Sequence, residues 1–255
     1  MSAGRSVGVG IDGCRAGWVA ARWDGATVAF ALFASIDAWA EARSWRSRRG
    51  EGGAATLIDV PIGLLEGDGV AGMQRGCDVA ARRRLKSRST SVFTPPCRGT
   101  LSARDYGEAC EANRRVLGRA MSLQAWHIVP KIAEVDAWLL GDAPKRRRVL
   151  AESHPELAFA VMTGEPLATR KRSADGRAER ANLLAEAMGV DVLAALGAWR
   201  ESEGVTRQAV ADDDALDAAV LAWVAAGMTD EVESIPAEAE VDRRGLPMQM
   251  IVRPG

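Results

Sequence analysis

An apolar alternation near the N-terminus limits most strongly what this chain can fold into. In residues 7–23, VGVGIDGCRAGWVAARW, the apolar residues from Val7 to Ile11 alternate with glycine, and Asp12 follows directly. A period of two is typical of a strand with one buried face. After a glycine-containing turn, a second alternation runs to Trp23. The stretch therefore predicts a β-hairpin with a carboxylate near the end of its first strand.

The next part of the chain predicts one more strand, a helix and a fourth strand. Residues 27–34 alternate like a strand, and residues 35–46 have a serine cap and helical spacing. Residues 50–53, GEGG, predict a loop. The stretch 55–64 begins as an apolar strand and stops near Asp59, because the proline that follows lacks a backbone donor.

The rest of the sequence, from residue 66 onward, predicts mainly helices and two further strands. Residues 66–142 contain several helical patterns and few strand-like runs, so we expect a mostly helical insertion, with a proline-rich loop at 89–100. After it we expect a strand in 146–156 that ends at Glu152, helices at 179–199 and 211–228, and a last strand at 245–254.

Composition excludes some classes of protein. The 255 residues are enough for a real core, and we expect one domain over residues 1–255. A net charge of −1 gives no global attraction to nucleic acid or to a membrane. No apolar run approaches the roughly 20 residues that cross a bilayer, and the N-terminus leads straight into a strand, so we expect a cytoplasmic protein. Four scattered cysteines and two histidines argue against a zinc site.

Five carboxylates fall at the ends of predicted elements. They are Asp12, Asp59, Glu152, Asp214 and Asp217. The last two are three residues apart on an otherwise apolar helix and share a face. Each could serve as a cap or turn residue. Together they could hold Mg²⁺ or Mn²⁺, because hard cations prefer oxygen ligands.

Several short motifs, in this order along residues 7–225, resemble the domain of unknown function 429 family, which is described as predicted ribonuclease H-like nucleases. The motifs are GIDGCRAGWV, LIDVPIGL, RGCDVAARRRL with SVFTPP, QAWHIVPKIAEVD, AESHPELAF with TGEPL, and DDALDA.

The resemblance implies an α/β fold of the ribonuclease H-like class. The expected core is a mixed five-stranded sheet, with strands one to three antiparallel, flanked by helices. It also implies that Asp12, Asp59, Asp214 and Asp217 hold the metal. Glu152, in the motif ESHPE, is expected near the site.

Basic side chains could bind the phosphates of a substrate. Arg82 and Arg83 belong to a cationic cluster, and Arg15 follows the first predicted strand. The resemblance adds Lys131, and His154 could transfer a proton. Each also has a structural interpretation: the arginines could lie in solvent, Lys131 could form an ordinary helical pair with Glu134, and His154 could be a satisfied structural residue.

The leading hypothesis is a metal-dependent phosphodiester hydrolase, a predicted nuclease, that acts on nucleic acid or a nucleotide-like phosphodiester. One alternative is a nucleotide-binding phosphotransferase of the actin and sugar-kinase type, although only one such unit is visible. Another is a non-catalytic binding protein. Eight tryptophans leave room for a buried homodimer interface.

Overall fold

The computed structural model describes residues 7–42, 45, 56–146, 148–227 and 231–255. The loop predicted at 50–53 lies outside the described residues.

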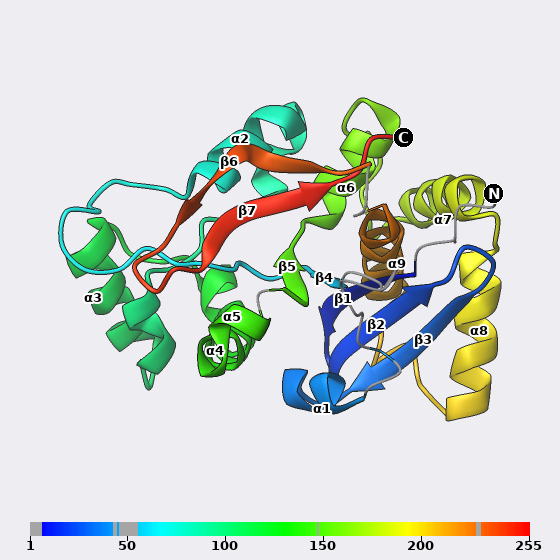
Figure 1. Ribbon diagram of the computed structural model, residues 1–255, viewed down its shortest axis with the longest axis horizontal. Coiled ribbons are helices and arrows are strands. Elements are labelled where there is room, and N and C mark those ends of the chain that lie inside the picture. Colours follow the sequence, from blue (N-terminus) through cyan, green and yellow to red (C-terminus); the bar gives the residue numbers. More distant parts are fainter. Residues whose placement is uncertain (1–6, 43–44, 46–55, 147, 228–230) are drawn as a thin grey trace.

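A five-stranded mixed sheet organises the fold. Its strand order is β3 (Val28–Phe33), β2 (Gly17–Trp23), β1 (Gly8–Cys14), β4 (Thr56–Ile58) and β5 (Leu150–Glu152). The pairs β1–β2 and β2–β3 are antiparallel, whereas β4 and β5 run parallel to β1. The α/β fold class predicted from the sequence, a mixed five-stranded sheet flanked by helices, is confirmed (Figure 1).

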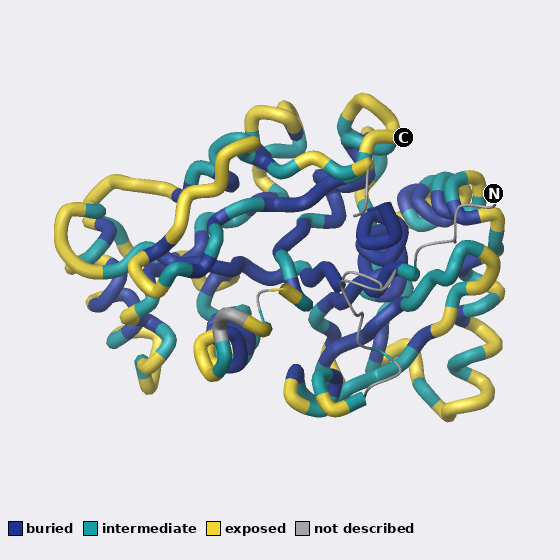
Figure 2. The backbone as a smooth tube through the Cα atoms, in the orientation of Figure 1, coloured by how far each residue is buried: buried dark blue, intermediate teal, exposed yellow. Residues whose placement is uncertain are grey.

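Helix α9 (Asp212–Ala226) packs directly on β1. Two glycines of the opening alternation face it, and a Cβ atom at Gly10 would lie 2.1 Å from the carbonyl oxygen of Ala218. A Cβ atom at Gly8 would lie 2.0 Å from the carbonyl oxygen of Ala222. The glycines therefore let the helix backbone approach the strand closely, and α9 is buried from Ala215 onward (Figure 2).

The other face of the sheet packs against α1 and α4. Ile11 and Ile58 lie in one buried cluster with Trp39 of α1 and with Ile132 and Leu139 of α4. The sheet is thus covered on both faces, as an α/β fold requires.

Most of the remaining helices follow β4. The described helices, with the short 3₁₀ turns labelled η, are α1 (Ile36–Glu41), α2 (Gly76–Leu85), η2 (Lys86–Ser91), η3 (Arg98–Ser102), α3 (Tyr106–Leu117), α4 (Leu123–Gly141), α5 (Ala143–Arg146), α6 (Pro155–Thr163), α7 (Ala174–Met188), α8 (Val192–Glu203) and α9. The helical insertion predicted after the fourth strand is present as α2 to α4.

Three details differ from the sequence prediction. The stretch 179–199 is two helices, because Gly189 adopts a left-handed conformation that ends α7. Helix α6 follows directly after β5, with His154 as its N-cap. The strand predicted at 245–254 is β7 (Pro247–Val252), but it pairs with β6 (Glu233–Val241) in a separate two-stranded sheet beside α2 (Figure 1).

In the part of the chain that the structure describes, no single helix has the length and apolar character to cross a membrane. The pair α7 and α8, which meet at 100°, satisfies the length and composition criteria only when taken together.

Candidate functional site

Asp12 and Asp59 lie together at the carboxyl ends of two neighbouring strands in the middle of the main sheet. Because β1 and β4 are parallel neighbours, their carboxyl ends lie together. Ile11 is the register partner of Ile58, and the Asp59 N–H donates to the Ile11 carbonyl at 3.0 Å. Asp12 and Asp59 each come one residue after these partners, so their side chains share a face of the sheet. This face is the one that packs against α9.

Helix α9 adds Asp217 to the two strand carboxylates. Asp217 immediately precedes Ala218, whose carbonyl contacts Gly10 across the helix–strand interface. The close approach that Gly10 permits therefore brings Asp217 beside Asp12. All three aspartates line one cavity of about 400 Å³.

Lys171 is the cation of this cluster. Its ammonium lies 2.8 Å from Oδ2 of Asp217, whose residue is only 1% exposed. The other carboxylate oxygen of Asp217, Oδ1, is buried and has no hydrogen-bond partner. Buried polar atoms almost always have a partner, so this oxygen calls for an additional ligand.

Burial and mutual repulsion perturb the three carboxylates. Burial raises the pKa of Asp12 well above its usual range, and the charges of Asp59 and Asp217 raise it further. Burial also raises the pKa of Asp59. The pKa of Asp217 rises to about 6, again mainly because of burial, although Lys171 opposes the rise. Such a cluster of buried, mutually repelling carboxylates favours the binding of a cation.

One face of α4 forms a second wall of the cavity. Gln124, His127, Ile128 and Lys131 line it, and their spacing of three and four residues places them on the same side of the helix. The segment after α2 adds Phe93 and other residues to the lining. The helical insertion therefore supplies one wall of the cavity.

Lys131 is the cation of that wall. Its ammonium donates to the Gly17 carbonyl at 2.5 Å and lies 4.2 Å from the ring centre of Trp18. Burial lowers its pKa. Trp18 in turn donates to Glu134 of α4 at 3.1 Å. These contacts tie the insertion to the hairpin that carries Asp12.

His154 and Glu156 of the ESHPE motif also line the cavity. The Nδ1 atom of His154 accepts from the Leu157 N–H at 3.3 Å, so the neutral ring carries its proton on Nε2, which lies 3.3 Å from the Ser91 carbonyl. The carboxylate of Glu156 is held by Arg180 at 2.5 Å and by Arg88 at 3.3 Å. Glu156 is thus already neutralised by arginine.

Glu152 does not line the cavity. It is the register partner of Ile58, one residue earlier than Asp59 in the ladder, so it lies on the opposite face of the sheet from Asp12. There Arg75 holds it by two hydrogen bonds of 2.6 and 2.9 Å, and the Ile62 N–H donates to it at 2.6 Å. Burial raises its pKa to about 7.

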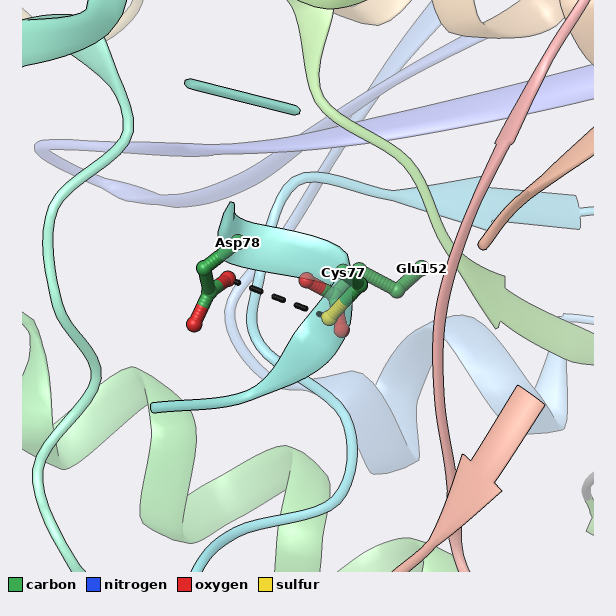
Figure 3. A group of neighbouring side chains, drawn as sticks. All are labelled: Cys77, Asp78 and Glu152. Carbon is green, nitrogen blue, oxygen red and sulfur yellow. Dashed lines mark hydrogen bonds between the residues drawn. The ribbon is translucent and has the colours of Figure 1, made fainter. Parts of the chain in front are cut away.

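Figure 3 shows Glu152 with Cys77 and Asp78, a buried group whose possible ligand atoms lie within 4.8 Å of one another. Arg75 also bonds both oxygens of Asp78, at 2.6 and 3.0 Å, so a guanidinium already occupies the place of a cation. Burial raises the pKa of the Cys77 thiol far above its ordinary value, which disfavours the thiolate that binds metals. This group does not suit a metal ion. Within the described residues the cavity aspartates, which are set wider apart around Lys171, do not form such a close group of three.

The other predicted residues lie outside the cavity lining. Asp214 accepts from the Ala211 N–H at 3.2 Å at the start of α9, although its charge raises the pKa of Asp12. Arg15 and Arg83 are exposed. Arg82 bonds the Val92 carbonyl and two neighbouring side chains, and so holds the loop after α2 in place.

The sequence reasoning missed Lys171 and left the role of Glu156 open. Lys171 lies in the run TRKRSADGR, which resembles any solvated loop. Only the packing of α7 against α9 brings this loop to Asp217. For Glu156, the buried Arg180 on α7 is the partner that the sequence does not reveal.

The fold and the site together define an α/β protein with a carboxylate-lined cavity at the carboxyl ends of two inner strands of its sheet. The family model described as Protein of unknown function (DUF429) matches residues 10–241. The chain belongs to this family. No curated protein and no solved structure matched the chain.

Proposed function

We propose that this protein is a metal-dependent phosphodiester hydrolase in which Asp12, Asp59 and Asp217 hold Mg²⁺ or Mn²⁺. The observation that carries the proposal is the buried, unpartnered Oδ1 of Asp217 in a cavity lined by two further aspartates. Three carboxylates are the donor set that hard divalent cations prefer. A bound divalent cation supplies a water of lowered pKa and offsets charge on a phosphate.

The chain's own residues suit a phosphate-bearing substrate. Lys131, on the wall that α4 forms, adds positive charge to the cavity that the three aspartates line. His154 offers an imidazole at the same cavity, with its tautomer fixed by the N-terminus of α6. A cavity of about 400 Å³ accommodates part of a nucleic acid strand or a small nucleotide-like phosphodiester.

Asp12→Asn tests this proposal. Calorimetric titration with Mn²⁺ is expected to show binding to the wild type and at least a tenfold weaker affinity in the variant. Cleavage of labelled single-stranded, duplex and branched nucleic acids, and of bis-nitrophenyl phosphate, is expected to need Mn²⁺ and Asp12. Asp37→Asn, at an exposed position in the first turn of α1, is the matched control and should leave both properties unchanged.

Either of two results would overturn the proposal. One is an Asp12→Asn variant that binds Mn²⁺ and cleaves as the wild type does. The other is a wild type that binds no Mn²⁺ and cleaves none of these substrates, which would leave a non-catalytic binding protein as the better interpretation.

A further inference from the structure

We propose that Lys171 is a permanent second cation of this site, so that the aspartate cluster takes one divalent ion and not a pair. This inference rests on the proposed metal-dependent function and narrows it. A pair of divalent ions clamps both oxygens of a displacement in many phosphodiesterases. Here, a side chain of the protein itself takes the place of one of them.

The first argument is the position of the ammonium. Lys171 lies 2.8 Å from Oδ2 of Asp217, while Oδ1 of the same carboxylate is buried without a partner. One oxygen is therefore already engaged by a fixed charge, and one remains for an ion. Lys171 and Asp217 line the same cavity as Asp12 and Asp59.

The second argument is the charge of the cluster. Three ionised aspartates and one ammonium leave two negative charges, which one divalent ion neutralises. A second divalent ion would leave the cluster two charges positive. Glu156 does not alter this balance, because Arg180 and Arg88 already pair with it.

The third argument is that the segment carrying Lys171 is anchored on both sides. Before it, the Thr169 hydroxyl bonds Glu179 of α7. After it, the Ser173 side chain caps α7 by accepting from the Gly176 N–H at 3.0 Å. A Cβ atom at Gly176 would lie 1.9 Å from the Arg170 carbonyl oxygen, so the helix packs tightly on this segment. These contacts fix the backbone on both sides of Lys171 and so place its side chain beside Asp217.

An ammonium has three donors, and only one is needed for Asp217. The others can face a phosphate oxygen beside the metal position and offset charge there. A lysine also keeps its charge without depending on the supply of a second ion.

The experiment measures how many Mn²⁺ ions bind each chain. Calorimetry on the full-length wild type is expected to give one ion, and the electron paramagnetic resonance spectrum should be that of isolated Mn²⁺ and not of a coupled pair. Lys171→Met is expected to bind Mn²⁺ at least as tightly, because a competing cation is gone. Its cleavage rate should nevertheless fall at least tenfold. Lys171→Arg keeps the charge and should recover part of that rate.

The control is Arg172→Gln, which removes an exposed neighbouring cation that lies 3.5 Å from Asp213. It should match the wild type in stoichiometry and rate. A wild type that cleaves with two coupled Mn²⁺ ions would overturn this inference and leave the proposed function standing. So would full cleavage by Lys171→Met. A wild type with neither Mn²⁺ binding nor cleavage would overturn the proposed function and the inference together.

Discussion

Replacing Asp217 with asparagine should stabilise the metal-free protein at pH 7. The pKa of this carboxyl is about 6, against an ordinary value of 3.8, because burial disfavours its charged form more than Lys171 favours it. A pKa difference of that size lowers the free energy of unfolding by at most roughly 3 kcal/mol at neutral pH. Asparagine has the shape of the protonated acid and avoids this penalty.

The pH dependence follows from the sign of the shift. A carboxyl whose pKa is raised by folding contributes stability that is fully present below its unfolded value of 3.8 and is lost as the pH rises through about 6. The advantage of Asp217→Asn over the wild type should therefore be largest above pH 7. About half of it should remain at pH 5 and about a fifth near pH 4, and it should almost disappear near pH 3.

Urea unfolding in EDTA at pH 7 and pH 5 measures this effect. We expect Asp217→Asn to exceed the wild type by about 1–3 kcal/mol at pH 7. Asp37→Asn, exposed on α1, should stay within about 0.5 kcal/mol of the wild type. The reasoning is refuted if Asp217→Asn is less stable than the wild type at pH 7, or if its advantage does not change with pH.

Mn²⁺ should reverse the order of the two proteins. An ion that binds only the folded wild type adds about 4.1 kcal/mol to its unfolding free energy at one thousand times the dissociation constant, which exceeds the advantage of the variant. Asp217→Asn should gain far less. The acid would thus destabilise the free protein and stabilise the loaded one, which is the pattern of a site kept for binding.

Two further substitutions test the framework of the site by urea unfolding. Gly10→Ala forces a Cβ against the backbone of α9, so it should lower the free energy of unfolding by at least about 1–3 kcal/mol and weaken Mn²⁺ binding. Gly197→Ala, in open space on α8, should raise the free energy of unfolding by about 0.5–1 kcal/mol. Equal effects of the two substitutions would refute the close-packing argument. Arg75→Met leaves Glu152 buried without its cation and should cost about 3–5 kcal/mol, whereas Lys86→Met breaks only an exposed ion pair and should cost less than about 1 kcal/mol. A small loss in Arg75→Met would contradict the role given to that guanidinium.

The order of strands and most helices could be predicted because their signals are local. The alternation ending at Asp12, the serine before α1 and the acids in the first turn of α9 each act within a few residues. Asp59 could be predicted as a partner of Asp12 from the family resemblance, which implies that both hold the metal.

Glu152 shows why the rest of the site could not be predicted. The sequence places it at the end of a strand, as it does Asp12, but which face it lies on depends on a register offset of one residue. That offset is set by pairing between distant strands. Likewise, Lys171 comes to the cluster through the packing of α7 and its loop, and no local pattern marks it.

Anomalous diffraction from crystals soaked in MnCl₂ tests the central claim most directly. The account predicts one Mn²⁺ peak per chain, in the cavity, within coordination distance of Asp217 Oδ1 and of at least one oxygen of Asp12 or Asp59. A map with no peak at these aspartates, or with its peak at Cys77, Asp78 and Glu152, would contradict it.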